Sequence, residues 1–170
     1  MRGTGGVCIS GAHGRLVHKK LLREFEEFAR TAPSATVLME EISKRLHKEM
    51  TRYNWVGFYL VDAQDSNILV VGAYVGSFTP NMRIPLNVGL CGAAASTGMS
   101  VVVDDVSKDS RYLAGSSLVK SEIVVPMFVK KKLVGELDIE SYFTSAFPKP
   151  EQDFVEACAR IVEGYLEKKA

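Results

Sequence analysis

The spacing of the hydrophobic residues changes twice along the chain, and this change constrains the fold more than any other feature. Apolar residues recur every three or four positions over residues 16–30 and again over residues 34–50, which is typical of helices with one buried face. Between residues 55 and 139, short runs rich in β-branched and aromatic residues replace this pattern and indicate strands. The helical period returns over residues 150–169. Such a chain is expected to fold as helices packed on a sheet.

The apolar runs and the turn residues between them define the expected elements. Gly98 is placed to end a short helix over residues 89–97. We predict strands over residues 55–61, 68–75, 83–85, 101–103, 122–129 and 133–139. Because short turns join strands that follow each other in the chain, the sheet is expected to be largely antiparallel, with the terminal helices on one face. The predicted fold class is therefore α+β.

Length and charge exclude several classes of protein. A chain of 170 residues is the size of one domain, and 46% hydrophobic with 24% charged residues is an ordinary globular composition. Its 21 basic and 20 acidic residues give a net charge of +1, which is low for a protein that binds nucleic acid through phosphate contacts. No apolar stretch is long enough for a membrane span, so we expect a soluble protein with no membrane partner.

The glycine-rich start of the chain and the cysteine count suggest where the domain lies and in which compartment. Residues 1–16 are expected to form a disordered tail, and residues 17–170 a single domain. No apolar signal segment follows Met1. Three cysteines, an odd number, fit a reducing cytoplasm better than secretion. We therefore expect a cytoplasmic location.

The usual motifs for metals and cofactors are missing. His13, His18 and His47 have no metal-site spacing and are expected to be solvated surface residues. Neither a phosphate-binding loop nor a Gly-x-Ser-x-Gly elbow occurs. We expect no metal and no cofactor.

Five strings of residues in the middle of the chain carry a resemblance to a known family. They are Asn-Trp-Val-Gly-Phe-Tyr-Leu at 54–60, Arg-Ile-Pro at 83–85, Gly-Leu-Cys-Gly at 89–92, Ser-Glu-Ile-Val-Val-Pro at 121–126 and Gly-Glu-Leu-Asp-Ile-Glu-Ser at 135–141. In this order they resemble the GAF domain over roughly residues 35–168. The resemblance is greatest to the branch that contains the free methionine-R-sulfoxide reductases.

This resemblance implies a six-stranded antiparallel sheet with a small-molecule pocket between the sheet and the loops of the middle segment. It implies a pocket lined by Trp55, Glu122, Asp138 and Glu140, with Tyr59 nearby; residue 140 is Glu where the family usually has Asp. The residues support this, because Asp138 and Glu140 share one face of a strand. An ammonium group between acids would offset their repulsion, and an aromatic wall would hold a thioether or sulfoxide. The alternative is that the acids are surface residues at a strand end and Trp55 is core.

The cysteines depart from the family pattern. The reductases use three cysteines, and the matching positions in this chain are Asn81, Cys91 and Gly115, the last in place of the nucleophile. Glycine has no group that can attack a sulfoxide. Cys91, near the start of a helix, is the only candidate for a catalytic thiol, whereas Cys158 is expected in the core.

Three functional hypotheses follow. The first is a small-molecule-binding sensor or regulatory domain that has lost the reductase chemistry, with no catalytic residue and an amino acid derivative as ligand. The second is a divergent free methionine-R-sulfoxide reductase that uses Cys91. The third is a structural dimerisation module. A homodimer is expected, since Val155, Val162 and Leu166 form a second apolar face on the last helix, although the same residues could simply widen the core.

Overall fold

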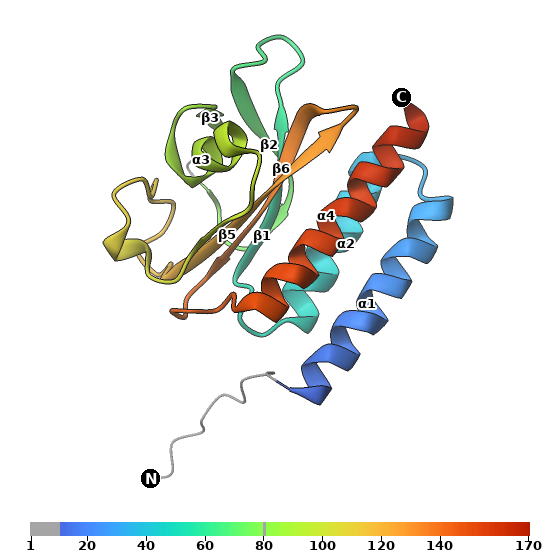
Figure 1. The fold of residues 1–170 in the computed structure, drawn as a ribbon, viewed down its shortest axis with the longest axis horizontal. Helices are drawn as coiled ribbons and strands as arrows, with labels where there is room; N and C mark the ends of the chain where they lie inside the picture. Colours follow the sequence, from blue (N-terminus) through green and yellow to red (C-terminus); the bar gives the residue numbers. More distant parts are fainter. Residues whose placement is uncertain (1–10, 80) are drawn as a thin grey trace.

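The computed structural model describes residues 11–79 and 81–170. The described elements follow the predicted order (Figure 1). The helices are α1 (Ala12–Thr31), α2 (Ala35–Glu49), α3 (Gly89–Thr97) and α4 (Lys149–Lys169), with one 3₁₀ turn at Val106–Lys108. The strands are β1 (Trp55–Val61), β2 (Ile68–Val75), β3 (Arg83–Pro85), β4 (Val101–Val103), β5 (Ser121–Val129) and β6 (Lys132–Ser141). Gly98 ends α3 in a left-handed conformation, as predicted.

The described strands form one six-stranded sheet in the order β3-β2-β1-β6-β5-β4. Every neighbouring pair is antiparallel, which confirms the predicted α+β class and sheet. Strands β1 and β6 lie side by side at the centre, although they are far apart in the sequence. Residues from the two ends of the domain therefore meet in the middle of the sheet.

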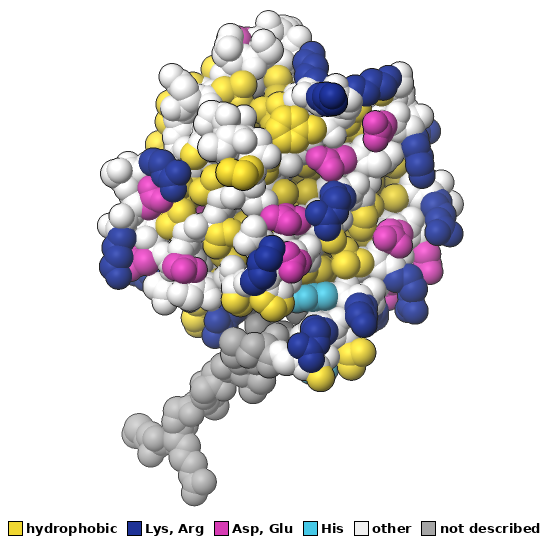
Figure 2. All heavy atoms as spheres, viewed as in Figure 1, with side chains coloured by type: hydrophobic (Ala, Val, Ile, Leu, Met, Phe, Trp, Pro, Cys, Tyr) yellow, Lys and Arg dark blue, Asp and Glu magenta, His cyan; other side chains and the backbone are white. Residues whose placement is uncertain are grey.

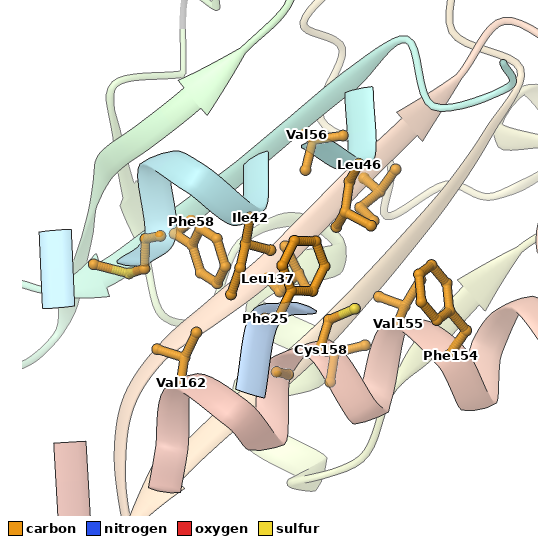
Figure 3. Packing of buried hydrophobic residues seen from close by; sticks show 14 of the residues in the cluster. Phe25, Ile42, Leu46, Val56, Phe58, Leu137, Phe154, Val155, Cys158 and Val162 are labelled. Atoms are coloured by element: carbon orange, nitrogen blue, oxygen red, sulfur yellow. The ribbon is translucent and has the colours of Figure 1, made fainter. Parts of the chain in front are cut away.

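Three helices cover one face of the sheet in two layers. Helices α2 and α4 lie against the strands, and α1 packs on α2 and α4 (Figure 1). Figure 3 shows the core between them, where Phe25 of α1, Ile42 of α2, Phe58 of β1 and Val162 of α4 point toward one another. The prediction that the terminal helices share a face is confirmed. The opposite face is left for α3 and the long loops.

The start of α1 differs from the expectation. The helix begins at Ala12, so residues 12–16 are helical rather than part of a disordered tail; residues 1–10 of the expected tail lie outside the described residues. His18, expected at the surface, is buried and stacks on Phe154 with ring centroids 4.0 Å apart. This stacking, together with burial of Gly14, packs the first turns of α1 on α4.

The second apolar face of α4 belongs to the core of the same chain. Val155 and Val162 are fully buried, and Leu166 packs against the core cluster. This face of α4 therefore widens the core of the same chain, which was the alternative to a dimer surface. Val155 and Val162 are therefore not free to contact a second copy of the chain, whereas Leu166 is partly exposed.

The surface shows no large region of one charge in the view of Figure 2, where basic and acidic side chains are interspersed. Within residues 11–79 and 81–170, no helix is both long enough and apolar enough to cross a membrane.

Candidate functional site

Strand β6 separates apolar from acidic residues onto its two faces. Leu137 and Ile139 belong to the helical core. Because side chains alternate along a strand, Glu136, Asp138 and Glu140 project from the opposite face. This strand alone places three carboxyl groups under the loops of the middle segment.

Glu122 joins these carboxyls from the neighbouring strand. In the register of β5 and β6, Glu122 lies directly opposite Glu140, and Val124 lies opposite Asp138. Residues directly opposite each other share a face of the sheet. One carboxyl oxygen from each of Glu122, Asp138 and Glu140 lies within 4.8 Å of the other two. We call these three residues the carboxyl cluster; one small cation, an ammonium group or a metal ion, can contact all of them at this spacing.

The carboxyl cluster is buried without a compensating positive charge. Glu122 and Asp138 are only 5% and 4% exposed. Among the described residues, no Lys, Arg or His lines the cavity over the cluster, and Asp138 Oδ1 has no hydrogen-bond partner. The other oxygen, Asp138 Oδ2, accepts a long contact of 4.0 Å from Cys91 Sγ. Such an arrangement costs free energy unless protons or a cation neutralise it.

The pKa values follow from this burial. Burial and repulsion from Glu140 raise the pKa of Glu122 well above its usual range, and burial and repulsion from Glu122 do the same for the pKa of Asp138. Burial raises the pKa of Glu140 to about 7. At neutral pH the cluster therefore retains protons, and a bound cation would displace them.

The cavity over the cluster is small and partly enclosed. Its volume is about 20 Å³, which is room for about one water molecule or ion. Its walls come from β1, β3, α3 and the loops on either side of β3 and before β5: Tyr59, Asn81, Ile84, Val88, Gly89, Leu90, Cys91 and Leu113. Asn81 connects these walls, because its carbonyl accepts from Tyr59 Oη at 2.9 Å and its Nδ2 lies 3.4 Å from the Leu113 carbonyl. A ligand larger than water requires the loops to separate.

Trp55 stands behind the cavity rather than in its wall. Its ring stacks on Tyr59 and Tyr74 at centroid distances of 6.1 and 5.5 Å. The indole lies over Gly57, where any Cβ would collide with it, and this explains the glycine in the Asn-Trp-Val-Gly string. Phe58 points to the helical core while Tyr59 faces the cavity, because side chains alternate along a strand.

Positions 81 and 115, which the sequence resemblance matches to cysteines of the reductases, lie next to each other. A Cβ built on Gly115 would be 3.6 Å from Asn81 Nδ2 and 3.7 Å from Glu140 Oε1. The fold therefore brings positions 81 and 115 together beside the carboxyl cluster. Neither carries a thiol, and burial together with the nearby carboxyls raises the pKa of Cys91 well above its usual range.

The sequence reasoning missed Glu136. It is fully buried on the same face as Asp138 and Glu140, and it contacts Cys91. Its position two residues before Asp138 on a strand was the available signal.

The comparisons with known proteins agree with this geometry. Residues 35–166 match the model of the GAF domain. This chain belongs to the GAF domain family. That assignment explains the antiparallel sheet with a cavity on the face away from the terminal helices.

Several GAF relatives have stated activities. The chain is 36% identical over 110 residues to the free methionine-R-sulfoxide reductase of Saccharomyces cerevisiae; this match covers 64% of the chain and 61% of the yeast protein. It is 32% identical to the Escherichia coli enzyme of the same name, over 71% of each chain.

The solved structures that this chain resembles include reductases and a protein named as a GAF sensor. The reductase of Neisseria meningitidis, solved with its substrate, has a TM-score of 0.86 and 29% identity, covering 96% of this chain and 98% of that one. A GAF sensor protein from Burkholderia vietnamiensis has a TM-score of 0.84 and 27% identity, covering 92% and 98%. The family is therefore established, and the likeness extends both to reductases and to a protein named as a GAF sensor.

Proposed function

We propose that this GAF domain binds a small molecule with a positively charged amino group over the carboxyl cluster. The observation that carries the proposal is the convergence of Glu122, Asp138 and Glu140 in a cavity whose described walls contain no basic residue. Tyr59, backed by Trp55, supplies an aromatic wall on one side. The structures of the Neisseria and Staphylococcus aureus reductases with their substrate make a methionine-like ligand the first candidate.

Binding without turnover is the second part of the proposal. Asn81 and Gly115 have no thiol to attack a sulfoxide or to form a disulfide. Cys91 is buried among carboxyls that disfavour its thiolate. The domain would thus act as a sensor or regulatory module.

Calorimetric titration tests ligand binding. Free L-methionine-R-sulfoxide, L-methionine and other small amines are titrated into the protein and into Asp138→Asn. Loss of a charge-assisted hydrogen bond of about 1.5–3 kcal/mol predicts at least about tenfold weaker binding for the variant. Asp153→Asn, an exposed acid on α4, is the control and should bind as the wild type does. If no amine bound, the ligand-binding proposal would fail and the structural-module alternative would remain.

A thiol-dependent reductase assay tests the lost chemistry. We expect no reduction of free L-methionine-R-sulfoxide with dithiothreitol by the wild type, and measurable reduction by Asn81→Cys/Gly115→Cys, because the two positions adjoin. Asn81→Ser/Gly115→Ser is the matched control without thiols. Turnover by the wild type that disappears in Cys91→Ser would instead establish the divergent reductase.

We also propose that the domain forms a homodimer. A groove of about 860 Å³ runs between α1 and α4, and its lining includes the partly buried Leu22, Ala29 and Ile161. Packing of a second copy there would cover these apolar side chains, which lie among acidic and basic side chains of the same groove. Light scattering that shows a monomer at working concentration would exclude the dimer.

A further inference from the structure

Position 115 has room for a side chain, although it is a glycine. The backbone of Gly115 lies outside the left-handed region, so its conformation suits any residue. A Cβ at this position would meet its nearest neighbours at 3.6–3.9 Å, which are ordinary contacts rather than collisions. All three neighbours are polar: Asn81 Nδ2, Glu140 Oε1 and Thr79 Oγ1. The glycine therefore leaves a small polar space beside the carboxyl cluster, which we call the Gly115 recess.

Asn81 is held at this recess through its main chain. Its carbonyl accepts from Tyr59 Oη at 2.9 Å, and its N–H donates to Thr79 Oγ1 at 3.1 Å. Contacts of this kind fix the position from which the side-chain amide reaches the recess. Because both contacts use main-chain atoms of Asn81, replacing its side chain leaves them in place.

The amide nitrogen of Asn81 has a proton to spare for a ligand. Nδ2 carries two protons, and the Leu113 carbonyl accepts from it only at a long distance of 3.4 Å. A second acceptor, Glu140 Oε1, borders the same recess. Both neighbours are acceptors, so the nitrogen end of the amide is the end that faces the recess.

The surroundings of the recess select the kind of ligand atom that suits it. An oxygen can accept the proton of Asn81 Nδ2, whereas a thioether sulfur is a weak acceptor and a methyl group accepts nothing. An anionic oxygen would be repelled by the carboxyl cluster when its acids are ionised. A neutral acceptor oxygen therefore fits better than either a thioether or a carboxylate.

We propose that Asn81 is a specificity-determining residue of the site, whose amide donates a hydrogen bond to a neutral oxygen of the ligand, such as a sulfoxide oxygen, in the Gly115 recess. This inference rests on the proposed function, because the amino group of the same ligand lies on the carboxyl cluster. The domain then prefers the oxidised form of a methionine-like ligand. Asn81 and Gly115 belong to different loops, before β3 and before β5, so the ligand oxygen also joins these loops.

Two ligands that differ by one oxygen test this preference. L-Methionine-R-sulfoxide and L-methionine are titrated calorimetrically into the wild type, Asn81→Leu and Asn81→Asp. One hydrogen bond predicts that the wild type binds the sulfoxide about two- to tenfold more tightly. Leucine has a similar size but no donor, and aspartate only accepts, so both variants should lose this preference. The ratio of the two Kd values cancels any change in affinity for the amino group, which the ligands share.

Two further variants separate the hydrogen bond from charge and folding. Asn87→Asp adds the same charge at an exposed position between β3 and α3, outside the cavity wall, and should keep the wild-type ratio. Gly115→Ala fills the recess with a methyl group and should weaken sulfoxide binding more than methionine binding. Its urea denaturation should match that of the wild type, because the added Cβ meets no atom closer than 3.6 Å.

Each outcome of the titrations decides between the two proposals. If both ligands bind but the ratio is the same in the wild type and in the two Asn81 variants, the role of Asn81 is refuted and the proposed function stands. A wild type that binds methionine as tightly as the sulfoxide refutes it as well. If neither ligand nor any other small amine binds, both proposals fail.

Discussion

At the scale of single residues, the turn between β5 and β6 shows where local preference and structure disagree. Lys130 and Lys131 form this two-residue turn, and both have positive φ angles, 50° and 65°. The right-handed twist of a hairpin favours such turns, but their usual residues are Asn and Gly, because a Cβ is strained in the left-handed region. The sequence predicted a join across Lys130 to Lys132, without the turn type.

Lys131→Gly should therefore stabilise the protein. Relief of the left-handed strain, less the extra entropy of glycine in the unfolded chain, predicts a gain of about 0.5–1 kcal/mol in the free energy of unfolding. Urea denaturation measures it. Lys132→Gly, the first residue of β6, is the control and should destabilise. A neutral or harmful effect of Lys131→Gly would show that the turn is not strained.

At the scale of elements, one acid in the first turn of α4 connects three segments. Glu151 Oε2 accepts a hydrogen bond of 2.6 Å from Tyr53 Oη, in the link between α2 and β1. Glu151 Oε1 lies 3.2 Å from His18 Nε2 of α1. The sequence suggested only that an acid suits a helix N-terminus. The contacts of Glu151 with Tyr53 and His18 join residues that are far apart in the sequence, so the sequence pattern did not indicate them.

Replacing Glu151 should loosen the packing of α1 and α4. Glu151→Ala leaves the buried hydroxyl of Tyr53 without an acceptor, which costs about 1–3 kcal/mol of the free energy of unfolding. Asp153→Ala, which removes only an exposed pair with Lys149, should cost less than about 1 kcal/mol. Urea denaturation of both variants at pH 7 compares them. Equal losses would contradict the role of Glu151.

At the scale of the whole molecule, the buried acids make stability depend on pH. Glu136 and Glu140 have pKa values of about 8 and about 7 in the folded protein, whereas a glutamate in the unfolded chain has a pKa of about 4.3. Between these values the folded state holds protons that the unfolded state has released. Stability is therefore lost as the pH rises through this window. Arg111 lowers the pKa of Asp109 to about 2, so Asp109 affects the pH dependence of stability only at more acidic pH.

The free energy of unfolding should thus be lower at pH 8 than at pH 5. Each group contributes a slope of up to about 1.4 kcal/mol per pH unit while it is protonated only in the folded state. Chemical denaturation at a series of pH values measures the profile, and Glu136→Gln should make the decline shallower. A flat or rising profile in the wild type would contradict the buried, uncompensated acids.

Local pattern was enough to define the elements and the fold class. Residues 55–61, 68–75 and 89–97 have the predicted structure, because the period of hydrophobic residues and the turn chemistry act over a few neighbouring positions. The shared face of Asp138 and Glu140 follows from the same short-range rule. The five strings that resemble the GAF family could also be recognised from the sequence alone.

Contacts between distant segments decided the rest. The register of β5 on β6 sets Glu122 opposite Glu140, and the packing of α3 on the sheet encloses Glu136. The stacking of His18 on Phe154 packs the first half of α1, which begins at Ala12, on α4. Burial and pairing depend on which surfaces meet, and no local period encodes this. Tertiary structure alone therefore determined that the acids of β6 meet Glu122 in a small cavity beneath the loops.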